Sequence, residues 1–247
     1  MGKMNYLIVS PVRSGSTWLN LVIAKHFNLF NVGESLCKIS PGMLLDPSKE
    51  RFIEGTKVHL PYTQQMQKLF NVDFRKLSRE QQLTELKKEP FVIKFTPWDL
   101  YEGSDEAYGY GYEFDRFREE MKPITTIFLY RKNLLEHFIS FNAVHKTGVM
   151  NADSPFMNYQ RPKMEYNQEE LDYYLAHKTI WEETYKEHGH KFDYTISYEE
   201  LFKMDELCGI PLKQYHEEFT LKLNRYTKEE LEECREQTGL EDNYEIC

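Results

Sequence analysis

The sequence has few of the features that place a protein in a membrane or an oxidising compartment. It has no apolar run near the ~18 residues that suggest a membrane-spanning helix, and no basic start followed by an apolar segment. Its four cysteines are widely scattered, without a C-x-x-C pair or a histidine at metal-ligand spacing. We therefore expect a cytoplasmic protein with reduced cysteines, no membrane partner and no metal.

A basic excess is also missing. The chain has 31 basic and 40 acidic residues, which gives a net charge of −9. Nucleic-acid binding in general needs a basic face for the phosphates, so this composition argues against a nucleic-acid partner. Any nucleotide site must be a local basic pocket in an acidic protein.

Two further absences limit the architecture. No Pro-, Gly- or Ser-rich linker divides the 247 residues, so we expect a single domain over 1–247. The string G-x-x-x-x-G-K-[ST] is missing, which excludes an ordinary nucleoside-triphosphate P-loop. The sequence leaves the oligomeric state open.

Residues 6–27 nevertheless predict a unit that binds phosphate. An apolar run at 6–9 is followed by Pro, Ser and Gly, and then by apolar residues at helical spacing from near residue 16. Such a strand-loop-helix unit presents backbone N–H groups at the helix start, where anions bind. The loop adds small residues, hydroxyls and one cation, namely Arg13, Ser14, Gly15, Ser16 and Thr17.

A second strand-helix unit lies at 124–146. The β-branched and aromatic residues at 124–130 predict a strand, and 134–144 predict a helix. Arg131 would then lie at the strand end and Ser140 on the helix, from where a guanidinium and a hydroxyl can reach one phosphate.

The first of these units closely resembles a known motif. SPVRSGSTW at 10–18 is similar to the 5′-phosphosulfate loop P-[KR]-S-G-[ST]-[ST]-[WF] of the sulfotransferases that use 3′-phosphoadenosine 5′-phosphosulfate (PAPS). Arg131 and Ser140 resemble the 3′-phosphate motif of the same family, with one more residue between them than is common. An extra residue in the turn at 132–133 would absorb that difference.

The resemblance implies a fold and a reaction. The fold is α/β and P-loop NTPase-like: three layers, with a central, mainly parallel sheet flanked by helices and strands near 6–9, 56–59, 91–95, 124–130 and 193–196. The reaction is sulfuryl transfer from PAPS to a hydroxyl or amine of an acceptor such as a carbohydrate or small metabolite, with release of adenosine 3′,5′-bisphosphate (PAP).

The resemblance also implies roles for single residues. Arg13 would stabilise charge on the leaving phosphate, and Lys94, which matches a family lysine, would assist at the sulfuryl oxygens. SYEELF resembles the Y-E-D-L segment, which assigns Tyr198 to the adenine, and Trp18 is the matching stacking residue. The ending LEDNYEIC resembles the N-Y-x-E tail of carbohydrate-type and microbial members.

Two residues compete as the general base. Glu34 follows a short extended segment, and a carboxylate near an anion has a raised pKa; carbohydrate-type and bacterial members resemble this arrangement. His59 lies in KVHLP, which resembles the KTHLP segment of cytosolic members. Thr96, however, stands where their histidine would be if 91–95 is the equivalent strand.

The acceptor itself is not given by the sequence. The Tyr-rich loop 98–118 and the polar loop 148–168 are candidates for the acceptor site. Two other functions remain open: a nucleotide or nucleoside kinase with a degenerate phosphate loop, and a non-catalytic PAP-binding protein of the same fold.

Overall fold

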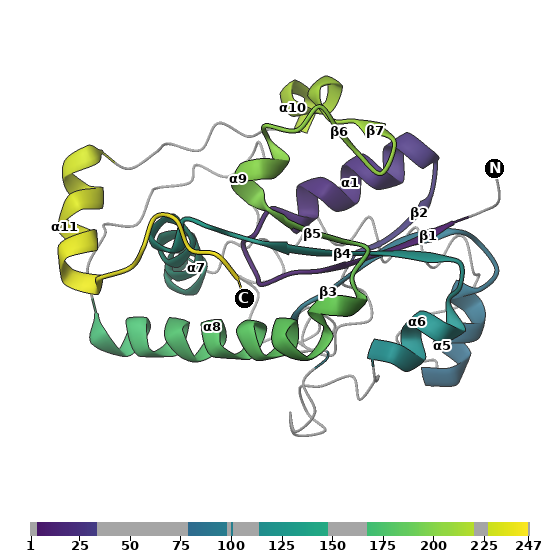
Figure 1. Ribbon diagram of the computed structural model, residues 1–247, viewed down its shortest axis with the longest axis horizontal. Coiled ribbons are helices and arrows are strands. Elements are labelled where there is room, and N and C mark those ends of the chain that lie inside the picture. The colour runs from purple at the N-terminus through teal and green to yellow at the C-terminus, as the bar shows by residue number, and fades with distance from the viewer. Residues whose placement is uncertain are drawn as a thin grey trace.

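The computed structural model describes residues 4–33, 79–97, 100, 114–147, 167–219 and 227–246. Within these ranges, five parallel strands form one sheet in the order β2-β3-β1-β4-β5 (Figure 1). The strands are β1 (Asn5–Val9), β2 (Phe30–Gly33), β3 (Phe91–Phe95), β4 (Ile124–Tyr130) and β5 (Tyr194–Ser197). Since β1 lies between β3 and β4, the segments that follow these three strands meet at one edge of the sheet.

Helices cover both faces of this sheet and make three layers (Figure 1). One face carries α1 (Ser16–Phe27), α9 (Tyr198–Leu201), α10 (Lys213–Phe219) and the hairpin of β6 (Glu206–Leu207) and β7 (Ile210–Pro211). The other carries α5 (Arg79–Leu86), α6 (Phe114–Glu120), α7 (Leu134–Thr147) and α8 (Gln168–His188). The short 3₁₀ helix η4 (Gly189–Lys191) continues α8, and α11 (Lys228–Thr238) contacts α7.

The strand sequences explain why there are two core layers. Successive side chains of a strand point to opposite faces of the sheet. In β1, Leu7 and Val9 join the apolar cluster beneath α5 to α8, whereas Tyr6 and Ile8 join the cluster beneath α1. A continuous apolar strand, buried on both faces, is typical of a parallel sheet covered by helices.

The predicted α/β fold is confirmed. The strands predicted at 6–9, 91–95, 124–130 and 193–196 correspond to β1, β3, β4 and β5, with ends that differ by at most one residue. Edge strand β2 occupies 30–33, where the sequence predicts only the end of an extended segment. The strand predicted at 56–59 lies outside the described residues.

The loop predicted over 98–118 is wrong in its last part, because residues 114–118 belong to α6. Phe114 and Phe117 are three residues apart, lie on one face of this helix and are almost fully buried. The rest of this segment, apart from Leu100, and residues 148–166 of the second candidate loop lie outside the described residues.

Candidate functional site

The loop between β1 and α1 has the backbone form of an anion site. Arg13 and Gly15 have φ angles of 70° and 81°, in the left-handed region. Helix α1 begins at Ser16, and its first turn has no acidic residue and no side-chain cap from the part of the chain that the structure describes. The N–H groups of a helix start, with the positive end of the helix dipole, are a common binding site for anions.

Position 15 of this loop requires a glycine because the ring of Tyr198 lies directly against it. A Cβ built on Gly15 would be 2.4 Å from Cδ2 of Tyr198, the first residue of α9. The guanidinium of Arg131 in turn lies over the Tyr198 ring, with Cζ 4.2 Å from the ring centroid. Tyr198 thus contacts both predicted phosphate-binding elements; its predicted contact with adenine stays a prediction.

The two motifs meet directly. Nε of Arg13 donates to Oγ of Ser140, on α7, over 3.1 Å. Ser140 therefore lies at the β1–α1 loop, although the spacing of its motif is one residue longer than is common.

Lys94 reaches the same loop from β3. Its side chain is 7% exposed, and Nζ donates to Oγ1 of Thr17 over 3.0 Å. Positive side chains from the ends of β1, β3 and β4 thus converge at one edge of the sheet. Such a grouping of positive side chains favours an anionic ligand.

Two buried polar groups of the site have no hydrogen-bond partner within the described ranges: Oγ of Ser14 and Nε of Arg131. Ser14 is 0% exposed, and the Arg131 side chain is 13% exposed. Arg131 Nη1 lies 3.9 Å from Glu136 Oε2, and a surface ion pair of this kind contributes little to stability. Because an unpaired buried polar group costs free energy, an incoming phosphate oxygen would be stabilised by both.

His137 holds the loop from below, a role that sequence reasoning missed. Its Nε2–H donates to the Val12 carbonyl over 2.7 Å, and Nδ1 lies 3.1 Å from the Tyr174 hydroxyl, which donates to the Leu134 carbonyl over 3.3 Å. Burial, with the Arg131 charge nearby, lowers the pKa of His137 to about 3. The imidazole is therefore neutral near pH 7, and its hydrogen bond to the Val12 carbonyl fixes the position of the loop.

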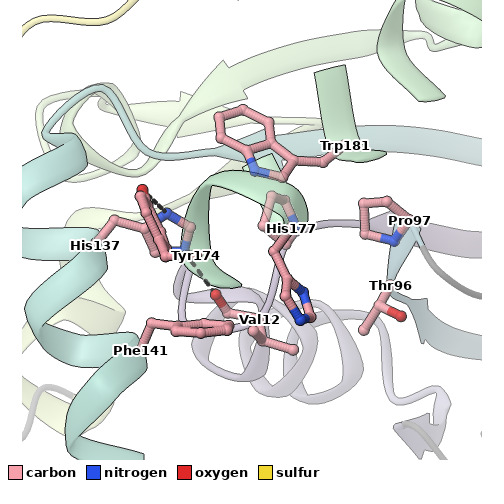
Figure 2. A pocket seen from close by; sticks show the side chains of 9 residues that line it. Val12, Thr96, Pro97, His137, Phe141, Tyr174, His177 and Trp181 are labelled. Carbon is pink, nitrogen blue, oxygen red and sulfur yellow. Dashed lines mark hydrogen bonds between the residues drawn. The ribbon is translucent and has the colours of Figure 1, made fainter. Parts of the chain in front are cut away.

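A small cavity lies beside His137, between the β1–α1 loop, the end of β3 and helices α7 and α8 (Figure 2). Its lining is largely apolar and comprises Pro11, Val12, Thr96, Pro97, His137, Phe141, Tyr174, His177 and Trp181. Thr96, the residue after β3, thus faces the same space as Pro11 and Val12 of the β1–α1 loop.

Trp18 packs into the core rather than opening to the surface. Its side chain is 8% exposed and lies with its ring centroid 4.9 Å from Phe202 and 5.6 Å from His216. Its indole Nε1 has no partner among the described residues. The adenine-stacking role of Trp18 stays a prediction.

Both candidate bases, Glu34 and His59, lie outside the described residues. In the described ranges, no group of three His, Cys, Asp or Glu side chains could hold a metal ion. None of the described helices combines the length and the apolar character needed to cross a membrane.

Comparison with known proteins gives one structural similarity. No protein-family model matches the sequence, and no curated protein matches it. The solved structure of a sulfotransferase domain from the curacin biosynthetic pathway superposes with a TM-score of 0.43 and 15% identity. The match covers 97% of this chain and 99% of that one.

Gly15→Ala is expected to destabilise the protein more than Gly209→Ala. Both glycines have φ near +80°, but a Cβ at position 209 meets no described residue within 4 Å, whereas one at 15 overlaps Tyr198. The backbone term, about 1–2 kcal/mol, is shared. Urea unfolding of the two variants measures the difference, and equal losses would contradict the packing of Tyr198 on Gly15.

The unfolding free energy should fall as the pH drops from about 6.5 toward about 3, because unfolded His137 takes up a proton that the folded protein excludes. The stability that neutral His137 contributes is fully present above pH 6.5 and is lost as the pH falls toward about 3. In His137→Gln the slope should be smaller by about 1.4 kcal/mol per pH unit. Urea titrations between these limits test this, and identical slopes would show that His137 is not buried neutral.

Proposed function

We propose that the chain is a single-domain, PAPS-dependent sulfotransferase. It would transfer the sulfuryl group to a hydroxyl or amine of a carbohydrate or small metabolite and release PAP. The observation that carries this proposal is the Arg13–Ser140 hydrogen bond, because it joins motifs 127 residues apart in the chain. In the family that the motifs resemble, one holds the 5′-phosphosulfate and the other the 3′-phosphate of one nucleotide.

The described residues fit the two anionic ends of such a nucleotide. The 5′ side would be held by the N–H groups in the first turn of α1, the buried Ser14 hydroxyl and the ammonium of Lys94. The 3′ side would be held by Arg131, whose Nε is buried. The fit is between fixed donors and oxygen-rich anions, which need no metal where cations of the chain neutralise their charge.

In the proposed reaction, the acceptor oxygen bonds to sulfur while the bond from sulfur to the bridging phosphate oxygen breaks. Glu34 or His59 would take the acceptor proton. Arg13, with the hydroxyls of Ser16 and Thr17, would stabilise the charge that develops on the leaving phosphate. Lys94 would do the same for the sulfuryl oxygens, so positioning and charge neutralisation provide most of the catalysis.

PAP is expected to raise the melting temperature, because a ligand that binds only the folded protein stabilises it as its concentration passes Kd. ATP with Mg²⁺ and 5′-AMP are the controls. Arg131→Ala should weaken PAP binding about tenfold to a hundredfold, the value of a charge-assisted contact. A larger shift with ATP and Mg²⁺ would favour a kinase, and binding of PAP without transfer to any of a broad acceptor panel would favour a binding protein.

Arg13→Ala should lower kcat about 100- to 1,000-fold, as expected when a stabilising donor is removed from a leaving oxygen. PAP affinity should fall only moderately. Lys25→Ala, on the exposed last turn of α1, is the matched charge control. Initial rates with PAPS and an accepting hydroxyl compound measure this, and unchanged turnover in Arg13→Ala would refute the mechanism.

The same assay separates the two candidate bases. Glu34→Gln should abolish transfer without loss of PAP affinity, whereas His59→Ala should leave the rate nearly unchanged. The opposite pattern would assign the base to His59.

A further inference from the structure

The turn at 131–133, which carries Arg131, is fixed by one carboxylate from a distant part of the chain. Oε2 of Glu199, on α9, accepts from the backbone N–H of Lys132 over 2.9 Å, and Oε1 accepts from that of Asn133 over 3.2 Å. Both oxygens of a single side chain thus bind two successive N–H groups. A carboxylate held in this way sets the path of the backbone directly after Arg131.

The same helix also supports the Arg131 side chain. Tyr198, the residue before Glu199, lies under the guanidinium at 4.2 Å. Helix α9 is itself fixed by a capping box, in which Ser197 and Glu200 exchange hydrogen bonds of 3.2 Å. The backbone and the side chain at Arg131 therefore take their position from one rigid element.

The segment 240–246 secures the turn from the other side. The Glu241 carbonyl accepts from the N–H of Leu134 over 2.9 Å, and the N–H of Tyr244 donates to the Lys132 carbonyl over 2.8 Å. Glu245 accepts from the Tyr130 hydroxyl over 3.0 Å and also binds the Lys132 ammonium. The turn is thus held on both sides by backbone and side-chain contacts.

Lys132 is neutralised in the process. Its ammonium binds Glu200 over 2.8 Å as well as Glu245, and these contacts raise the pKa of Lys132 while lowering the pKa of both carboxyl groups. The positive charge of Lys132 is therefore already paired, whereas Nε of Arg131 has no hydrogen-bond partner among the described residues.

We propose that Glu199, supported by the segment 240–246, is the positioning residue of the Arg131 site. The inference rests on the proposed function and deepens it. Glu199 acts through the turn and does not contact the nucleotide, because both of its oxygens already accept N–H groups. Removing it lets the guanidinium move from the 3′-phosphate, and a small misplacement is costly in a preorganised site.

The test compares PAP with a nucleotide that lacks the 3′-phosphate and carries a sulfate on its 5′-phosphate. Calorimetric Kd values are measured in the full chain for PAP and for this second nucleotide, adenosine 5′-phosphosulfate. Glu199→Ala should raise the Kd for PAP about tenfold and leave the Kd for adenosine 5′-phosphosulfate nearly unchanged. Glu199→Gln keeps one acceptor oxygen and should recover part of the loss. Glu183→Gln, an exposed carboxylate of α8, is the matched control.

A double-mutant cycle shows whether Glu199 acts through Arg131. In an Arg131→Ala background, Glu199→Ala should cause no further loss of PAP affinity, because the positioned group is gone. A general structural role would instead add its loss in both backgrounds. Melting temperatures without nucleotide check folding, and if Glu199→Ala does not fold, Glu245→Gln tests the same turn from its exposed side.

The outcomes separate the two claims. Equal weakening of both nucleotides, or additive losses in the cycle, would overturn the positioning role while leaving the proposed function intact. If the Glu199 variants bind PAP as tightly as the wild-type chain, the positioning role is also overturned and the proposed function stays intact. Failure of the wild-type chain to bind PAP would overturn the proposed function and this inference with it.

Discussion

Confinement of three positive charges at one edge of the sheet is the constraint around which the site is built. Arg13, Lys94 and Arg131 repel one another. Among the described residues, the Ser140 hydroxyl accepts from Nε of Arg13, and the Thr17 hydroxyl accepts from Nζ of Lys94. Neutral acceptors orient the cations without cancelling their charge. Positive side chains gathered in one place favour an anionic ligand even in a protein with a net charge of −9.

Much of this arrangement could be predicted from the sequence, because it depends on local patterns. Apolar runs of four to seven residues gave β1, β3 and β4, and parallel strands place their carboxyl ends together. That topology alone brings Arg13 and Arg131 to one edge. The sequence places Ser140 on the helix after Arg131 but does not predict its hydrogen bond with Arg13, which depends on α7 beginning immediately after the turn.

The rest depends on partners far along the chain, for which no local pattern exists. His137 contacts Val12 across 125 residues and Glu199 holds the turn at Lys132 across 67, so neither residue type signals its role. Helix α6 was missed because a Gly- and Tyr-rich segment precedes it, although Phe114 and Phe117 have helical spacing. Trp18 fits both a stacking motif and an apolar helix stripe, and its placement in the core needs the neighbouring Phe202.

The position of Tyr198 links two loops that are separate in sequence. Its ring excludes any side chain at position 15 and supports the guanidinium at position 131. A smaller residue at 198 would open space beside the first loop and remove the platform of the second in one step. Positions 15, 131 and 198 should therefore evolve together. Homologous chains should keep the glycine, the arginine and the aromatic ring as a set, or replace all three.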